Sequence, residues 1–311
     1  MLRHLGYVAI ALSLDAPTNR TCRLRNATPG RLRALIAQNL ANLERVLAYN
    51  ATLDVHLYRI TSDIVPFASH PVNRVPWWTE FAPTLAHLGR IVRRDGLRVS
   101  MHPGQFTVLN SVTPVVATMA AAEVHWHTRF LDALGVGDDA KIVIHIGSMA
   151  DGRQAAIARF ADAVEGLPAR CRARLIIEND DRLFSSEDAL AASGATGLPV
   201  VFDWLHHRAL PGRATSGTAT RDLVRACFAT WRTTDGLPKV HLSSQARGGR
   251  PGQHGDWVRA RDVTAFLAVA PPRPFDAMLE AKRKDQALVR LRHDLARLGI
   301  RESGRLARHS A

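Results

Sequence analysis

Cysteine is scarce in this chain of 311 residues, and its three cysteines lie far apart. Cys22, Cys171 and Cys227 form no Cys-x-x-Cys pair, which argues against a disulfide framework and against a zinc site built from thiolates. The sequence also lacks an apolar run of about 20 residues, the length that a membrane-spanning helix needs. The amino terminus has no apolar segment followed by a cleavage site. These absences predict a cytoplasmic protein that does not cross a membrane.

Acidic residues are the minority among the charged ones: 28 Asp and Glu stand against 41 Lys and Arg, a formal net charge of +13. An excess of this sign favours a polyanionic partner, because Arg and Lys neutralise phosphates. The charge alone also fits two simpler origins. A basic surface keeps a protein soluble, and an arginine-rich, lysine-poor composition can also follow from a GC-rich genome.

A repeated pattern runs through the chain: a short apolar run ends in His, Asp or Glu, and a stretch long enough for a helix follows. The run Leu175-Ile-Ile-Glu178 is the clearest example. Eight such strands are predicted, at residues 5–14, 55–60, 97–102, 141–145, 174–178, 198–203, 238–241 and 275–280. The alternation indicates an α/β fold, a single (β/α)8 TIM barrel over residues 1–298, with a metal site at the C-terminal ends of its strands.

Between the predicted strands, apolar residues recur at helical spacing. Thr28 as N-cap and Pro29 in the first turn predict a helix that continues through Leu47. Further helices are expected at residues 77–94, 114–134, 154–164, 187–193, 218–229, 261–268 and 286–298. The segment 61–76 is longer than an ordinary connection of about 2 to 6 residues, so we expect it to carry function. Residues 299–311 are predicted to form a basic, disordered tail.

Seven potential metal ligands follow consecutive strands three to eight, and barrel closure would bring them into one bowl. They are His102, His145, Glu178, Asp203, His206, His241 and Glu280. Imidazole and carboxylate groups without thiolates suit Zn or Mn, and more than four ligands indicate more than one ion. Ions about 3.5 to 4 Å apart serve displacement at phosphorus by activating water and stabilising the leaving oxygen. Glu178, at the centre, is a candidate bridge between two ions.

Alternatives for this bowl stay open. A barrel mouth can hold polar residues for solubility alone, although seven potential ligands at equivalent positions make that a weaker reading of the pattern. A sugar isomerase or epimerase also uses carboxylates, histidines and divalent ions at a barrel mouth. The positive charge and the arginine-rich loop after the seventh strand weigh against an isomerase without excluding it.

Lys239 precedes His241 by two residues, so strand periodicity points both side chains into the barrel. An ammonium group beside divalent cations is electrostatically unfavourable. We therefore predict that Lys239 is neutral, paired with a carboxylate, or covalently converted to an anion.

Several side chains are candidates for contact with DNA. Gln105 and Phe106, after the third strand, offer an amide to replace base hydrogen bonds and an aromatic ring to stack on bases. Packing within its own loop is an equal alternative for Phe106, and a core position is an equal alternative for Tyr7. Three arginines fit contacts with backbone phosphates, although a solvated loop would carry them too: Arg247, Arg250 and Arg259.

Taken together, these residues resemble the UV damage endonucleases, which are metal-dependent repair nucleases for photolesions. The resemblance covers about residues 5–287 and extends to the barrel of the related AP endonucleases. It rests on Leu5-Gly-Tyr7, Thr18-Asn-Arg-Thr21, Pro66-Phe-Ala-Ser-His-Pro71, Ser100-Met-His-Pro-Gly-Gln105, Glu178-Asn-Asp180, Asp203-Trp-Leu-His-His207, Pro238-Lys-Val-His-Leu-Ser-Ser-Gln245 and Glu280-Ala-Lys282.

The resemblance implies incision of duplex DNA immediately 5′ to cyclobutane dimers, 6-4 photoproducts and some other lesions, with up to three Mn²⁺ or similar ions. By position, His254 joins the seven ligands above. His70 matches a histidine near the scissile phosphate, and Lys239 matches a lysine that the family carries in carboxylated form. Gln105 and Phe106 match the pair that wedges into the duplex opposite the flipped lesion.

Two positions depart from the family pattern. Phe106 stands where the wedge often ends in Tyr, and Ala11 falls where some members carry an Asn near the lesion pocket. The resulting hypothesis is a monomeric, damage-specific DNA endonuclease in which Glu178, His70 and Lys239 are catalytic and damaged double-stranded DNA is the partner. The alternatives are an AP endonuclease of the related barrel type and a metal-dependent sugar isomerase or epimerase.

Overall fold

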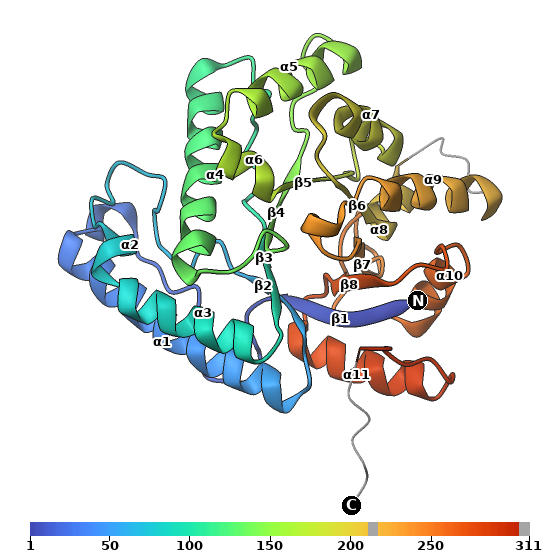
Figure 1. Ribbon diagram of the computed structural model, residues 1–311, viewed down its shortest axis with the longest axis horizontal. Helices are drawn as coiled ribbons and strands as arrows, with labels where there is room; N and C mark the ends of the chain where they lie inside the picture. The colour runs from blue at the N-terminus through green and yellow to red at the C-terminus, as the bar shows by residue number, and fades with distance from the viewer. Residues whose placement is uncertain (211–216, 305–311) are drawn as a thin grey trace, which may run out of the picture.

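The barrel is closed by eight parallel strands that pair in sequence order, with β8 returning to β1 (Figure 1). The computed structural model describes residues 1–210 and 217–304. The strands are β1 (Leu2–Ala9), β2 (Leu57–Ile60), β3 (Arg98–Met101), β4 (Lys141–His145), β5 (Leu175–Glu178), β6 (Val200–Asp203), β7 (Lys239–Leu242) and β8 (Phe275–Leu279). This architecture confirms the predicted (β/α)8 TIM barrel.

The helices surround the strands on the outside of the barrel (Figure 1). They are α1 (Pro29–Thr52), α2 (Trp77–Glu80), α3 (Ala82–Arg94), α4 (Pro114–Leu134), α5 (Arg153–Glu165), α6 (Ala169–Arg174), α7 (Ser186–Thr196), α8 (Trp204–Ala209), α9 (Gly217–Ala229), α10 (Ala260–Leu267) and α11 (Lys284–Ala296). Two 3₁₀ turns, η1 (Leu24–Asn26) and η2 (Thr233–Asp235), complete the described elements. The Thr28 hydroxyl accepts the Arg31 N–H at the start of α1, which confirms the predicted N-cap.

The first strand differs from its prediction at both ends, because it runs over Leu2–Ala9 and not over residues 5–14. Ala9 adopts a φ of 72°, a left-handed conformation that cannot continue a strand. The turned carbonyl of Ala9 accepts the hydroxyls of Thr18 (3.1 Å) and Tyr58 (2.6 Å). The backbone therefore leaves the sheet at Ala9 and starts the first loop earlier than expected.

Three helical features also differ from prediction. The helix expected at 77–94 is two helices, because Pro83 lies in the first turn of α3 and lacks the N–H that would continue α2. The short helices α6 and α8 were not predicted. Helix α8 begins directly after β6, where the Asp203 carboxylate accepts the His206 N–H at 2.7 Å.

The predicted start of the disordered tail, residue 299, is too early, because residues 302–304 form hydrogen bonds with β1. Glu302 is buried and accepts the Leu5 N–H at 2.6 Å, while Arg292 Nε lies 2.6 Å from its other oxygen. The Ser303 N–H donates to the Leu2 carbonyl at 3.0 Å. The expectation of disorder is thus wrong for this segment. The remaining tail, with Arg305, Arg308 and His309, lies outside the described residues.

The barrel interior is layered. At the amino ends of the strands lie two buried ion pairs, Lys141 with Asp235 at 2.5 Å and Arg98 with Asp276 at 2.9 Å. Apolar side chains fill the next layer, among them Val8, Leu57, Met278, Val143, Ile176 and Val201. The polar residues predicted as metal ligands lie beyond this layer, at the carboxyl ends.

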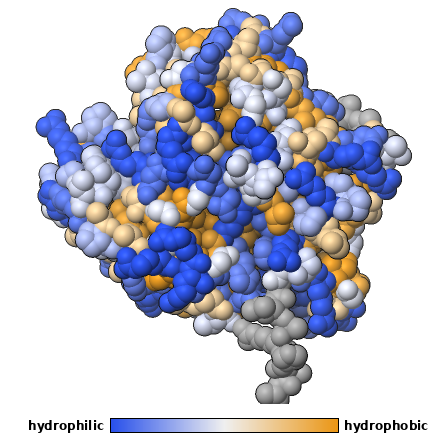
Figure 2. All heavy atoms as spheres, in the orientation of Figure 1, coloured by the Kyte–Doolittle hydropathy of each residue, from blue (hydrophilic) through white to orange (hydrophobic). Residues whose placement is uncertain are grey.

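Hydrophilic side chains predominate on the face drawn in Figure 2, with apolar residues between them. Within the described ranges, no helix has both the length and the apolar character needed to span a bilayer. The largest fully buried apolar side chains instead pack within the protein, as Phe130, Phe160 and Phe266 do.

Candidate metal centre

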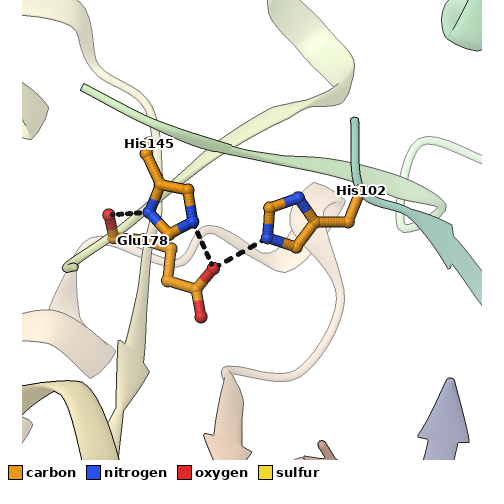
Figure 3. Close-up of side chains that lie close together, drawn as sticks. All are labelled: His102, His145 and Glu178. Carbon is orange, nitrogen blue, oxygen red and sulfur yellow. Dashed lines mark hydrogen bonds and ion pairs between the residues drawn. The ribbon is translucent and has the colours of Figure 1, made fainter. Parts of the chain in front are cut away.

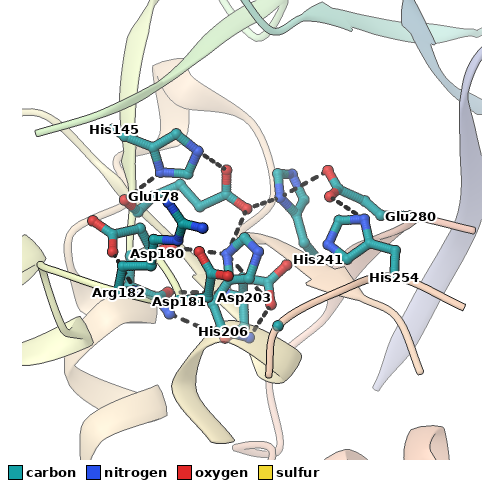
Figure 4. Close-up of polar contacts among 12 residues, drawn as sticks. His145, Glu178, Asp180, Asp181, Arg182, Asp203, His206, His241, His254 and Glu280 are labelled. Atoms are coloured by element: carbon teal, nitrogen blue, oxygen red, sulfur yellow. Dashed lines mark hydrogen bonds and ion pairs between the residues drawn. The ribbon is translucent and has the colours of Figure 1, made fainter. Parts of the chain in front are cut away.

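The eight predicted metal ligands lie together in three contiguous groups at the carboxyl ends of β3 to β8 (Figures 3 and 4). The groups are His102, His145 and Glu178; Asp203, His206 and His254; and Glu178, Asp203, His241 and Glu280. Within each group, one ligand atom per residue lies within 4.8 Å of the others. Glu178 and Asp203 each belong to two groups, so the three groups form one continuous cluster.

Glu178 is the shared carboxylate of the first and third groups. Its Oε2 lies 3.0 Å from His102 Nε2 and 3.5 Å from His145 Nε2 (Figure 3). Its Oε1 faces His241 Nδ1 at hydrogen-bond distance (Figure 4). Although burial raises the pKa of Glu178, the neighbouring imidazoles of His241, His102 and His145 hold it well below the ordinary value. Glu178 is therefore a buried carboxylate that stays ionised between two ligand groups.

Three of the histidines are oriented in the same way by backbone carbonyls. Nδ1 of His102 contacts the Pro103 carbonyl at 2.9 Å, and Nδ1 of His145 contacts the Glu178 carbonyl at 3.3 Å. Nδ1 of His206 contacts the Asn179 carbonyl at 3.0 Å. A histidine whose Nδ1 contacts a carbonyl can bind a metal ion through Nε2, which is the usual outer-shell arrangement of metal-binding histidine.

Asn179 is a functional candidate that sequence reasoning missed. Its side chain links the ends of β5 and β6, because Nδ2 donates to the Asp203 carbonyl (3.1 Å) and Oδ1 accepts the Asp203 N–H (2.8 Å). Together with its carbonyl contact to His206, this residue orients Asp203 at the end of β6 and His206 in α8, two candidate ligands of the second group. Its place between Glu178 and Asp180 was the available signal.

Asp203 and His206 lie side by side, with His206 Nδ1 3.8 Å from Asp203 Oδ1. Burial raises the pKa of Asp203 to about 7, although the adjacent His206 lowers it. Burial lowers the pKa of His206, but the carboxylates of Asp203 and Glu178 outweigh it and raise the value to about 9. Asp203 Oδ2 is buried and has no hydrogen-bond partner among the described residues. Imidazole nitrogens around an unsatisfied carboxylate oxygen fit a divalent cation such as Zn²⁺ or Mn²⁺.

The third group contains a second side chain that the sequence reasoning missed, Arg59 of β2. Its Nη2 lies 2.5 Å from Glu280 Oε1 and 2.9 Å from His241 Nε2. Burial lowers the pKa of His241 to about 4. Burial raises the pKa of Glu280, but Arg59 and His241 outweigh it and lower the value. The available signal was strand parity, since Arg59 follows the interior residue Leu57 by two positions.

His254 reaches the centre from the long loop that follows β7. An isolated antiparallel β-bridge between Gln245 and His254 folds this loop back on itself. His254 Nδ1 lies 3.5 Å from Glu280 Oε2. Figure 4 shows His254 beside Glu280 and opposite His206. The loop thus brings a candidate ligand to the groups formed at the strand ends.

Lys239 lies on the interior side of β7 and is buried. Its Nζ has no hydrogen-bond partner among the described residues, so pairing with a carboxylate, one of its three predicted states, is not observed. Burial, together with the charges of Arg98 and Arg59, lowers the pKa of Lys239 well below its ordinary value. These surroundings favour an uncharged amine over an ammonium ion.

A cavity of about 1380 Å³ opens over the ligand groups. His70, Gln105, Phe106 and Arg250 all line it, as expected for residues that meet a substrate. Phe106 is 68% exposed, and its ring lies over Gly104 of the same loop, so the side chain is open to the cavity while it also contacts its own loop. His70 is held by the Val72 N–H, which donates to Nδ1 at 3.0 Å. The predicted wedge and the predicted phosphate histidine therefore border the same cavity as the ligands.

Tyr7 does not reach this cavity, and its predicted contact with DNA is wrong. The side chain is fully buried, and its hydroxyl donates to Asn50 Oδ1 of α1 at 2.6 Å. Its ring packs on Tyr58 with 5.1 Å between centroids. Tyr7 points from β1 toward the surrounding helices and not into the bowl, which makes it a core residue.

The three loop arginines lie in different settings. Arg247 and Arg250 are exposed, and Arg250 Nη1 contacts Asp181 Oδ2 at 2.6 Å at the cavity wall. Arg259 Nε contacts Asp262 Oδ2 at 2.9 Å beside α10. Arg250 is thus the one of these three that lines the cavity.

His127, behind the centre on α4, gives a prediction for stability. It is fully buried, and burial lowers its pKa from 6.5 to about 3. Below pH 6.5 the unfolded chain therefore binds a proton that the folded chain does not, so stability falls as pH decreases toward 3. Between pH 7 and pH 5 we expect this group to remove about 2 kcal/mol from the free energy of unfolding. Urea unfolding of wild type and His127→Gln at both pH values measures it; an equal pH dependence in the two proteins contradicts the assignment.

A closed barrel of eight parallel strands, with candidate ligand groups at the carboxyl ends, places the protein in the TIM-barrel class. The 3-keto-D-glucoside 4-epimerase YcjR of E. coli shares this fold at a TM-score of 0.55 and 11% identity, over 96% of this chain and 99% of that one. A sequence model of one family, described as UV-endonuclease UvdE, matches residues 3–307. The chain belongs to this family, which confirms the resemblance to the UV damage endonucleases.

Individual relatives agree with this assignment. The UV DNA damage endonuclease of Bacillus cereus (strain Q1) is 32% identical over 306 residues, 95% of each chain. The enzyme of the same name from Bacillus anthracis (strain A0248) is 31% identical over the same shares. The crystal structure of SacUVDE matches with a TM-score of 0.87 and 32% identity, over 96% of this chain and 99% of that one. Membership of this family supports a nuclease that acts on DNA.

Proposed function

We propose that this protein is a monomeric endonuclease that cuts duplex DNA immediately 5′ to UV photolesions, cyclobutane dimers and 6-4 photoproducts, with divalent ions, preferably Mn²⁺, in its three ligand groups. The observation that carries the proposal is the position of these groups on the wall of the cavity that Gln105 and Phe106 also line. The cavity thus combines a metal centre for the phosphodiester with an exposed aromatic ring for the bases.

When bound, the ions supply activation of water and stabilisation of charge on the leaving oxygen. The protein's own residues would hold the ions and orient the phosphate. Glu178 joins two ligand groups, and Asn179 fixes Asp203 and His206 in register. Because the Val72 N–H donates to Nδ1 of His70, the neutral ring carries its proton on Nε2, where it can donate to a phosphate oxygen.

Lys239 has a separate role in this proposal. A neutral, buried amine can react with carbon dioxide to form a carbamate, whose oxygens are suitable metal ligands. The low pKa and the unpartnered Nζ of Lys239 support this modification. A ¹³C carbamate resonance after growth with labelled bicarbonate, lost in Lys239→Met, tests it; its absence in the metal-loaded wild type would reject the carboxylated state.

Phe106→Ala gives a prediction for lesion recognition. Stacking contributes about 1 to 3 kcal/mol per base, so we expect affinity for a dimer-containing duplex to fall about 5- to 150-fold, with a much smaller loss for undamaged duplex. Fluorescence anisotropy with both duplexes measures the two affinities. Leu298→Ala is the matched control, because Leu298 is a similarly exposed apolar side chain, at 58%, outside the cavity lining. Equal losses on both duplexes would reject the wedge.

The reaction itself is tested with one end-labelled duplex that carries a single cyclobutane dimer, alongside undamaged and abasic duplexes, with Mn²⁺ or with a chelator. The proposal predicts a metal-dependent cut immediately 5′ to the dimer. Cleavage at the abasic site alone would instead indicate an AP endonuclease. No cleavage of any duplex would return the sugar epimerase to consideration.

A further inference from the structure

Arg59 brings a permanent positive charge into the third ligand group. The side chain is buried among the ligands, with its Nη2 2.5 Å from Glu280 Oε1 and 2.9 Å from His241 Nε2. A guanidinium group does not lose its proton in a protein. Any cation bound between Glu280 and His241 must therefore share these two ligands with a fixed cation.

The carboxylates of the other two groups lie in different surroundings. Among the ion pairs of the described residues, the carboxylates of Glu178 and Asp203 meet histidines only. Most histidines of these groups also differ from His241. His102, His145 and His206 rest Nδ1 against a backbone carbonyl. His241 instead faces charged side chains, because its Nδ1 faces Glu178 Oε1 and Arg59 Nη2 lies 3.5 Å from its Nδ1 and 2.9 Å from its Nε2.

We propose that Arg59 is a built-in counter-ion of the third group, which balances Glu280 in the absence of metal and weakens the binding of a divalent ion there. The groups then fill in order, the first and second before the third. Because like charges at these distances repel in a poorly solvated site, the repulsion acts selectively on the group that Arg59 touches. Arg59 is thus a positioning residue that sets metal occupancy. The inference rests on the proposed function only in taking the three groups as metal sites.

Metal binding tests this without any measurement of activity. Wild type and variants are stripped with chelator and titrated with Mn²⁺, and free Mn²⁺ is counted by its EPR signal. We expect wild type to show a tight class and a weaker class of sites. Arg59→Gln should tighten the weaker class by at least about tenfold and leave the tight class unchanged. Arg59→Lys, which retains the charge, should keep the weaker class.

Two further variants serve as controls. Arg59→Met retains much of the aliphatic stem and replaces Arg59→Gln if that variant does not fold by circular dichroism. Arg225→Gln removes an exposed arginine that pairs with Asp222 on α9 and should behave as wild type. An unchanged or weakened weak class in both uncharged variants would overturn the proposal, as would tight binding of all ions in wild type.

The Mn²⁺-binding test of Arg59 can fail or succeed independently of the incision test of the proposed function. If the weak class tightens as expected but the dimer-containing duplex is not cut, the metal inference holds and the proposed function fails. If the dimer is cut in a Mn²⁺-dependent manner but the uncharged variants bind Mn²⁺ as wild type does, only the role of Arg59 fails. Wild type that binds no Mn²⁺ would overturn both.

Discussion

Glu178→Gln is expected to reduce incision of a dimer-containing duplex by more than about 100-fold while the barrel stays folded. Loss of an outer-shell partner of a metal ligand reduces metal affinity or activity by about 10- to 100-fold, and Glu178 is itself a candidate ligand in two groups. The amide keeps the shape of the side chain but removes the negative charge that the surrounding imidazoles stabilise. Initial rates with saturating Mn²⁺ measure the effect.

Glu165→Gln provides the matched control. This substitution makes the same chemical change at an exposed position at the end of α5, so the variant should cut at the wild-type rate. Circular dichroism and the unfolding midpoint show whether Glu178→Gln has kept the fold. A folded Glu178→Gln protein with near wild-type incision would contradict the assignment of Glu178 as the shared carboxylate.

Asp235→Asn is expected to lower the free energy of unfolding by about 3 to 5 kcal/mol, because it leaves the buried ammonium group of Lys141 without its counter-charge. The two side chains are 3% and 1% exposed and lie 2.5 Å apart at the amino end of the barrel. Lys141 also donates to the Ala173 carbonyl at 2.7 Å, so it is held in place when the carboxylate is neutralised. Denaturant unfolding at pH 7 measures the loss.

The exposed pair of Arg225 and Asp222 is the control for this prediction. These side chains are 63% and 60% exposed, and Asp222→Asn should change stability by less than about 1 kcal/mol. Replacing Lys141 with Met in the Asp235→Asn background should recover part of the loss, since it removes the uncompensated charge. A loss below about 1 kcal/mol in Asp235→Asn would mean that Lys141 is not an ion of the folded state.

The strand ends were the most predictable part of the molecule. Seven ligand candidates came from one local rule, that polar residues after buried parallel strands meet at the carboxyl end of a barrel. All seven lie in the three groups. His254 was expected only from the resemblance to a family, because it lies in a loop whose path depends on its bridge to Gln245.

Other features depended on contacts between distant segments. Both faces of a barrel strand are buried, so the apolar pattern around Tyr7 does not tell which face meets the helices. Glu302 is held in place by Arg292 and by the backbone of β1. The residues next to Glu302 in the sequence give no sign of these contacts. The split between α2 and α3 is different, because Pro83 was a local signal and was overlooked.

Local chemistry therefore determined the strand–helix alternation, the ligand types and the exposed Gln105 and Phe106 beside the third strand, since each depends on residues near in sequence. Only the tertiary structure decided how the ligands divide into groups, which of them share Glu178 and Asp203, and that Arg59 enters the third group. The physical reason is that barrel closure sets the distances across the bowl. Electrostatic interactions depend on those distances and on burial, and strand order alone supplies neither.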